Sequence, residues 1–250
     1  MRIIGIAIAS CLIACSAAAQ QAPATPSQCD FKPDGGGFAG SCGAMFGEAP
    51  SFALKPGAAT GLWRADAHPS AAWIGTMTDS DGKFPVSLEI YAGGRGIMRT
   101  EYGWFAVAQF AASPGLRFTL DATGEIKPGT LDRKIIARAA AILSLDSVWN
   151  RKDNRVCPPD ATQWSIYCAM RKATMEVTGA PDHRRPAMEA VRTIIDARSA
   201  GRNYQHRLMD YNNDPTTTLA DVQSLFREAL AGMDDPAWLA RHGFAATQLF

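Results

Sequence analysis

The sequence has no excess of charge of either sign. Its 250 residues include 25 Lys or Arg and 24 Asp or Glu, which leaves a net charge of +1. Proteins that bind nucleic acid through a large surface are normally strongly basic, so this balance argues against that class. Apolar residues make up 47% of the chain, which is enough to bury a core and excludes a disordered tail.

Long hydrophobic runs are also missing, apart from one near the amino terminus. That run extends from Ile3 to Ala14 and follows a single basic residue, Arg2. It is shorter than the roughly 20 apolar residues that a membrane-spanning helix needs. The basic residue, the short apolar run and the small residues after it are typical of a secretory signal peptide. We therefore expect a periplasmic or secreted protein, with a signal peptide over residues 1–19 and a polar linker over 20–28.

Two processing patterns overlap in this segment. The three alanines at 17–19 fit cleavage of the signal from an exported protein that is then released. The segment 12–15, Leu-Ile-Ala-Cys, resembles a bacterial lipoprotein box, in which Cys15 would carry the lipid. The sequence leaves both open, and membrane attachment is expected only through lipid at Cys15.

The chain contains no C-x-x-C pair, and four cysteines lie beyond the signal segment. An even number of cysteines in an oxidising compartment indicates disulfides. Of the three ways to pair four cysteines we favour the local one, because each pair then lies within one short segment. A zinc site is the alternative, which the wide spacings disfavour. The expected disulfides are Cys29 with Cys42 and Cys157 with Cys168.

Residues 29–128 have the pattern of a β module. The segment 84–91 alternates, with Val86 and Leu88 on one face and Ser87 and Glu89 on the other. Between 71 and 121 there are five such short runs, separated by turns rich in Gly and Asp, which predicts an antiparallel meander. With one apolar face, the meander should close into a small barrel or pack on helices.

Residues 129–250 have the pattern of a helical module. Apolar residues at helical spacing, such as Ile135, Ala139 and Ile142, predict a first helix with Thr130 as its N-cap. Further start and stop signals predict three more helices and a shorter one over 204–210. These signals are a capping box at Asp160 and Gln163, a stop at Gly179, a first-turn Pro186, and a capping box at Thr218 and Asp221.

The expected fold is therefore α+β, with an amino-terminal antiparallel meander or small barrel followed by a helical module of four to five helices.

Basic residues concentrate in one part of the helical module. The segment 151–207 contains eleven Lys or Arg and six Asp or Glu, a net charge of +5. Such a segment can bind an anionic small molecule, a cell-wall ligand or an envelope partner, although these side chains can also satisfy one another at helix junctions. The candidate ligand-binding residues are Arg184, Arg185, Arg202, Arg207, Asn212 and Asn213.

The same region offers weak candidates for acid–base catalysis in His183, His206 and Asp210. A His–Asp pair also needs a nucleophile or a metal, and no serine or free cysteine is obviously placed to supply one. Asp210, Asn212 and Asp214 have the spacing of a calcium loop, but Pro215 stands where the sharp turn needs glycine. We therefore expect no metal and no cofactor.

Part of the helical module resembles an uncharacterised bacterial domain family. The residues that carry the resemblance are Cys168-Ala169-Met170, the segment Tyr211-Asn212-Asn213-Asp214, and the Thr218 cap before Leu219-Ala220-Asp221-Val222. The family pattern has a Cys-Ala-Leu-Gly helix, an aromatic-Asn-Asp turn and a Thr-capped last helix, and this chain departs from it at Met170-Arg171 and by one extra Asn. The resemblance implies no activity.

The sequence thus favours an exported, non-enzymatic binding or accessory module for an anionic ligand or an envelope partner. A hydrolase or lyase that uses the His/Asp/Arg residues, and a purely structural lipoprotein, are the alternatives.

Overall fold

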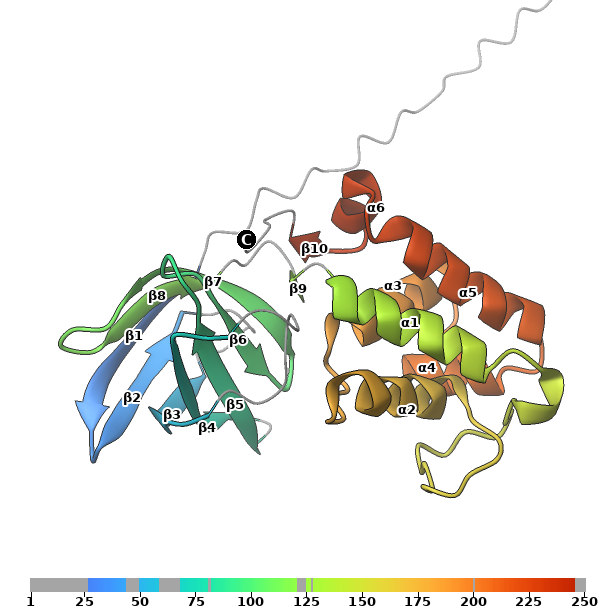
Figure 1. Cartoon of the computed structure of the whole chain (residues 1–250), viewed down its shortest axis with the longest axis horizontal. Coiled ribbons are helices and arrows are strands. Elements are labelled where there is room, and N and C mark those ends of the chain that lie inside the picture. Colours follow the sequence, from blue (N-terminus) through green and yellow to red (C-terminus); the bar gives the residue numbers. More distant parts are fainter. Residues whose placement is uncertain are drawn as a thin grey trace, which may run out of the picture.

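The chain folds into a β-barrel followed by a helical module, which lie side by side (Figure 1). The computed structural model describes residues 27–43, 50–58, 68–80, 82–120, 125–126, 128–199 and 201–245. The predicted signal peptide, Cys15 and most of the predicted linker lie outside these residues. The α+β prediction, with barrel before helices, is confirmed.

Eight antiparallel strands form the barrel, and each strand pairs with the next in the sequence. The barrel closes because β1 pairs with β8, placing Ser27 opposite Leu120 and Phe31 opposite Leu116. This pairing begins inside the predicted linker, because Ser27 and Gln28 already extend the ladder. The strands are β1 (Ser27–Asp34), β2 (Gly37–Cys42), β3 (Ser51–Pro56), β4 (Ala71–Asp79), β5 (Gly82–Ile90), β6 (Gly96–Thr100), β7 (Gly103–Ala111) and β8 (Leu116–Leu120).

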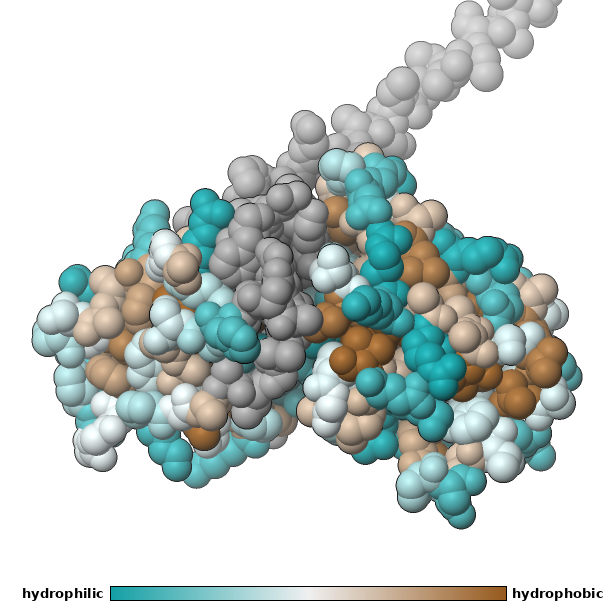
Figure 2. All heavy atoms as spheres, viewed as in Figure 1, coloured by the Kyte–Doolittle hydropathy of each residue, from teal (hydrophilic) through white to brown (hydrophobic). Residues whose placement is uncertain are grey.

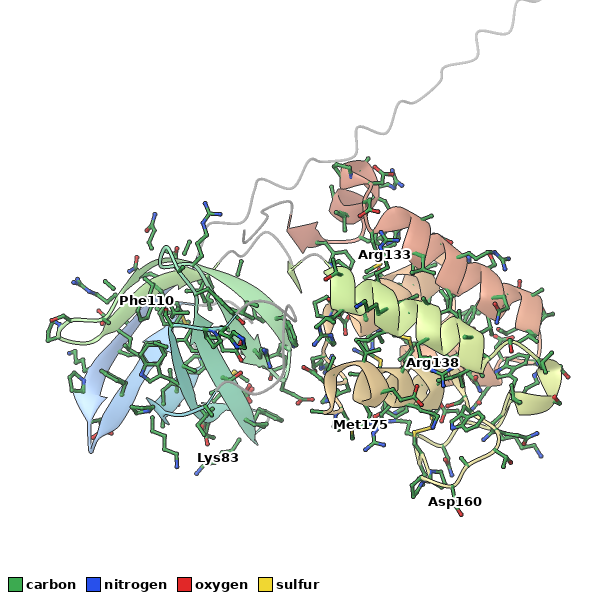
Figure 3. All side chains as sticks on the ribbon, viewed as in Figure 1. Lys83, Phe110, Arg133, Arg138, Asp160 and Met175 are labelled. Carbon is green, nitrogen blue, oxygen red and sulfur yellow. A yellow bond between two sulfur atoms is a disulfide. The ribbon has the colours of Figure 1, made fainter. Side chains whose placement is uncertain are left out.

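The barrel interior is filled by aromatic and aliphatic side chains and by a disulfide. Cys29 and Cys42 lie directly opposite each other on β1 and β2, are fully buried, and are joined as predicted. The ring of Phe118 stacks on that of Phe31, and its other neighbour is Phe110, which Figure 3 labels on the barrel.

The helical module follows from Thr130 (Figure 1). Its core is largely aliphatic, with fully buried residues such as Ile135, Ile194 and Leu225 from three helices. The helices are α1 (Thr130–Ile142), α2 (Ile166–Thr178), α3 (Pro186–Arg198), α4 (Arg207–Asn213), α5 (Leu219–Gly232) and a short α6 (Pro236–Arg241), with a 3-10 turn η1 (Asp146–Val148). Hydrophilic residues cover much of the outer face of this module, with apolar atoms between them (Figure 2).

Three of the predicted helix signals are confirmed. Pro186 is the first residue of α3, where its missing N–H needs no partner. Thr218 and Asp221 form the capping box of α5, in which each side chain binds the other residue's backbone N–H. Gly179 ends α2 in the left-handed conformation, with φ of 79°, which glycine adopts without strain.

The predicted start of α2 at Asp160 and Gln163 is wrong. The N-cap is Ser165, whose hydroxyl accepts a hydrogen bond from the Cys168 backbone N–H. The chain is still extended just before it, because Trp164 forms a β-bridge with Trp149. The Gln163 side chain instead donates to the carbonyl of Ser147 at 3.0 Å. Tertiary contacts therefore override a local capping signal.

Two other predicted helix boundaries are also displaced. Thr130 is the first helical residue and Gly129 is the N-cap, because Asp132 reaches back to the Gly129 N–H at 2.8 Å. The short helix predicted over 204–210 is α4, three residues later. It buries Leu208 and Tyr211, so the expected aromatic-Asn-Asp turn is in fact the last turn of that helix.

Two further features complete the fold. Cys157 and Cys168 form the second predicted disulfide, which ties the loop before α2 to the first turn of that helix. Short strands β9 (Glu125–Ile126) and β10 (Phe244–Ala245) pair in parallel between the barrel and the helices (Figure 1). Within the described residues, no helix is both long and apolar enough to cross a membrane.

Candidate functional site at the junction of the two modules

The outer face of the barrel carries a buried charged network where it meets the helices. Residues that pair directly across neighbouring strands point to the same side of the sheet, so Ser87, Arg99 and Trp104 form a row across β5, β6 and β7. Arg99 pairs with the buried carboxylate of Glu89 on the same face, with Nη2 to Oε1 at 2.9 Å.

Burial has opposite effects on the two groups that bind Glu89. It raises the pKa of Tyr91, whose hydroxyl donates to Glu89 at 2.7 Å. It lowers the pKa of Arg99, although the nearby carboxylates of Glu89 and Asp182 oppose this effect.

A second buried ion pair holds the start of α3 against the start of α1. The Oδ1 atom of Asp132 accepts from Arg185 Nε at 2.8 Å and from the Ala187 backbone N–H at 3.2 Å. Both charged side chains are almost fully buried, at 0% and 1% exposure for Asp132 and Arg185. The guanidinium of Arg185 also lies 4.9 Å from the ring centre of Trp104, which gives a cation–π contact across the junction.

Polar contacts between β6–β7 and the loop before α3 fix the two modules together. The Trp104 indole N–H donates to Asp182 Oδ2 at 3.2 Å. Glu101 accepts from His183 Nε2 at 3.1 Å, which places the ring proton on that nitrogen. The guanidinium of Arg184 lies 3.6 Å from the same carboxylate. The loop that carries His183 and Arg184 is therefore held by the barrel as well as by the helices.

A small pocket of about 200 Å³ opens beside this loop. We call it the basic pocket. Its charged and titratable lining residues are Glu101, Arg155, Tyr167, His183, Arg184, Arg192, His206 and Arg207.

One buried carboxylate, Glu189, serves three of the arginines of the basic pocket. It pairs with Arg192 one helical turn later, with Arg207 Nη2 at 3.2 Å, and with Arg184 Nη1 at 3.8 Å. Burial alone would lower the pKa of Arg207, but the carboxylates of Glu189 and Asp196 outweigh it and raise the pKa. Positive charge thus outnumbers negative charge in the lining of this pocket.

Arg155 differs from the other three arginines. Its φ is +64°, in the left-handed region that side-chain-bearing residues seldom adopt. Its partner among the described residues is the ring of His206, with Nη1 to Nε2 at 3.4 Å, and none of the described carboxylates pairs with it. Because a guanidinium only donates, the His206 nitrogen must be the acceptor.

The loop around Arg155 is fixed on both sides. Asp153 Oδ1 accepts the Arg155 backbone N–H at 2.8 Å. The backbone of Asp153 is in turn bound by both side-chain atoms of Asn213, at 2.7 and 2.8 Å. The disulfide of Cys157 closes the other end. Backbone strain persists where surrounding structure fixes it, and it is often found at functional sites.

The structure brings together only part of the predicted catalytic set. His183 and His206 line the same pocket. The carboxylate of Asp210 binds the backbone of His206 and not its ring. Its Oδ2 accepts the backbone N–H of His206 at 2.8 Å and so supports the start of α4. Among the described residues that line the pocket there is no serine or cysteine.

The predicted ligand-binding residues divide into two groups. Arg184 and Arg207 line the basic pocket, whereas Arg185 does not line it and pairs with Asp132. Arg202 lies elsewhere and pairs with Asp214 at 2.7 Å.

The two predicted asparagines have structural roles. Asn212 is fully buried, and its Oδ1 accepts from the Trp149 indole N–H at 2.8 Å and the Ile166 backbone N–H at 3.0 Å. Asn213 holds Asp153, as described above, and thereby supports the Arg155 loop.

No group of three His, Cys, Asp or Glu side chains suited to a metal ion occurs in the part of the chain that the structure describes. The four cysteines after Cys15 are all in disulfides, so the zinc alternative is wrong.

Sequence reasoning missed Glu101, Arg192, Arg99 and Trp104 as parts of the junction. Arg99 and Trp104 reach it because they lie on the outer face of the barrel, at positions that alternate with interior residues. The alternation of apolar residues could have marked Arg99 as outward-facing. It could not have shown that this face docks on the helices.

Comparison with known proteins adds one finding. Residues 127–231, which contain α1 to α4 and all but the last residue of α5, match a family described as "Family of unknown function (DUF6197)". No curated protein matches the chain, and no solved structure does. The helical region is therefore similar to an uncharacterised domain, and the barrel precedes the matched residues.

Proposed function

We propose that this chain is an exported envelope protein, periplasmic or secreted, that binds an anionic ligand in the basic pocket and has no catalytic role. The observation that carries the proposal is Arg155. Its guanidinium lies in a pocket lined by three other arginines, lacks a carboxylate partner among the described residues, and is fixed in a left-handed backbone conformation. An oxyanion is the natural acceptor for such a group.

The ligand is expected to place one charged group in the pocket. At about 200 Å³ the pocket has room for a phosphate or carboxylate group, and a larger ligand would extend out of it. On binding, Arg155 would exchange its long contact with His206 for bonds to the oxyanion. Phosphorylated compounds and acidic cell-wall fragments share this chemistry.

Export is supported by the two disulfides, which form and persist in oxidising compartments. The signal-like segment 1–19 supports it as well. We take the Cys168 helix and the Thr218 cap to be this chain's version of the pattern of the uncharacterised family.

Calorimetric titration tests the binding proposal, with tripolyphosphate and muramyl dipeptide as probes. We expect saturable binding of at least one probe, at least tenfold weaker binding in Arg155→Gln, and weaker binding as salt screens the charges. The matched control is Arg138→Gln on α1 (labelled in Figure 3), which removes an exposed arginine that pairs with Glu176. Lack of binding by either probe, or equal losses in the two variants, would contradict the proposal.

A hydrolase or lyase is the second candidate function, because His183 and His206 line one pocket. Turnover of p-nitrophenyl acetate or p-nitrophenyl phosphate that disappears in His206→Gln would support it. Rates equal to those of buffer would count against it.

A structural lipoprotein is the third candidate, and it depends on Cys15. Incorporation of a radioactive fatty acid that is lost in Cys15→Ser would show an anchored protein. Absence of label in the parent chain would favour a released one.

A further inference from the structure

A second, larger pocket lies between the barrel and the loop before α3. We call it the interdomain cleft. Its floor is the outer face of the barrel, where Ile74, Ser87, Arg99 and Trp104 are neighbours across β4 to β7. Its other wall is the chain from Thr178 to Arg185. The volume of about 630 Å³ is in the range of pockets that hold small organic ligands.

The lining of the interdomain cleft is mainly apolar. Ile74 and Pro85 contribute from the outer face of the barrel, and Ala180 and Pro181 contribute from the opposite loop. This composition separates the cleft from the basic pocket, although the two share Glu101, His183 and Arg184 as a common wall. A ligand that fits here must have an apolar body.

The cationic end of the cleft has unused hydrogen-bond donors. Arg185 is 1% exposed, and its Nη2 is buried with no hydrogen-bond partner, while its Nε binds Asp132. The Nε of Arg184 is buried without a partner as well. Buried donors are rarely left unpaired in native proteins, so each one calls for a partner.

The surroundings favour an oxyanion as that partner. The Arg185 guanidinium lies 4.9 Å from the ring centre of Trp104, and its Nη2 still has a donor for an acceptor such as a carboxylate or phosphate oxygen. Of the two carboxylates in the lining, Asp182 is bound by the Trp104 indole and by the Arg184 backbone N–H. Glu101 is bound by His183 and lies close to Arg184. Neither carboxylate accepts a hydrogen bond from Arg184 Nε or from Arg185 Nη2.

We propose that the interdomain cleft binds a small organic anion with an apolar body. Its oxyanion head accepts hydrogen bonds from Arg184 and Arg185, and its apolar body lies against Ile74, Pro85 and Pro181. This site is distinct from the basic pocket, because Arg155 lines only the pocket and Ile74 lines only the cleft.

Calorimetric titration of the full chain with octanoate tests the proposal. We expect saturable binding with one site, and at least tenfold weaker binding of acetate, which lacks the body, and of octanol, which lacks the charge. Octyl phosphate compares a phosphate head with a carboxylate head. Ile74→Glu and Pro181→Glu place a negative charge in the cleft and should each weaken octanoate binding at least tenfold. Pro181 lies in an exposed loop, so its variant folds even if the strand variant does not.

Two controls separate this site from the basic pocket. Arg155→Gln should leave octanoate binding unchanged, and Pro181→Glu should leave tripolyphosphate binding within about twofold of the parent chain. A second measurement follows the indole N–H resonance of Trp104, which should shift on octanoate binding. The proposal is overturned if octanoate does not saturate at millimolar concentration, if octanol binds as well as octanoate, or if a folded Pro181→Glu variant binds octanoate normally.

Discussion

The two modules differ in where they place their charged groups. The barrel encloses aromatic rings and a disulfide, and its buried charges, Glu89 and Arg99, lie on the outer face toward the helices. The helical module has a largely aliphatic core and a buried ion pair of its own, Asp132 with Arg185. The two charged sets meet at Trp104, whose ring lies 4.3 Å from the Arg99 guanidinium. The comparison shows that the buried charges of both modules gather where the barrel meets the helices.

The largest effect is expected from the buried ion pair of the helical module. Asp132→Ala leaves Arg185 charged and buried, and also removes the acceptor of two backbone N–H groups. Removal of one partner of such a pair typically costs about 3–5 kcal/mol. Urea unfolding followed by circular dichroism at 222 nm should show this loss.

The matched control for this variant is Asp234→Ala, which removes an exposed partner of Arg133 and should cost less than about 1 kcal/mol. Equal losses in the two variants would show that the junction pair has no special role.

The next largest effect on stability is expected from removal of each disulfide, one in each module. The two loops are of similar length, with separations of 13 and 11 residues, so each loss should cost about 2–3 kcal/mol in the chain-entropy account. Only the double variant Cys157→Ser/Cys168→Ser should also weaken anion binding, because that disulfide fixes the Arg155 loop. Thermal unfolding and calorimetric titration measure the two effects. Weaker anion binding in Cys29→Ser/Cys42→Ser would contradict the expectation that only the disulfide of the helical module supports the binding site.

A smaller effect is expected at the cap of α5. Thr218→Ala removes the hydroxyl that accepts from the Asp221 backbone N–H at 3.2 Å. Loss of such a cap costs about 1 kcal/mol. Thr119→Ala on the barrel, whose exposed hydroxyl donates to Ala108, serves as the control and should change stability by less. Chemical unfolding of both variants makes the comparison, and a larger loss in the barrel variant would contradict it.

The smallest effect is a pH dependence in the α4–α5 connection. Hydrogen bonds from Thr216, with further bonds from Tyr204 and Arg202, hold the pKa of Asp214 well below its ordinary value. Because the folded pKa is lower than the unfolded pKa of about 3.9, this stabilisation is present above that pH and is lost as pH falls below it. The free energy of unfolding, measured between pH 5 and pH 2, should fall less steeply with pH in Asp214→Asn than in the parent chain. An identical slope in the variant would contradict this assignment.

Local features of the fold could be predicted from the sequence, and contacts between distant segments could not. The alternation around Val86 predicted a strand, and Thr218 with Asp221 predicted the start of α5, because both depend on neighbouring residues. Closure of the barrel depends on β1 pairing with β8, almost 90 residues later, and no local pattern encodes it. The start of α2 was misplaced for the same reason, since the bridge between Trp149 and Trp164 determines it.

The candidate site shows the same division. The basic segment pointed to the region of Arg184 and Arg207, and both line the basic pocket. It also included Asn212, whose amide holds together the start of α2 and the loop before it. Glu101 and Trp104 come from the barrel, and only the docking of the two modules makes them part of the site.

The most direct test of the central claim is a nuclear magnetic resonance titration of the ¹⁵N-labelled chain with tripolyphosphate. The claim is that the basic pocket at the junction binds an oxyanion. It predicts saturable shifts that are largest at the backbone amides of Arg155, His183, Arg184 and His206, and that are lost in Arg155→Gln. Shifts that do not saturate, or that centre on another surface and persist in that variant, would contradict it.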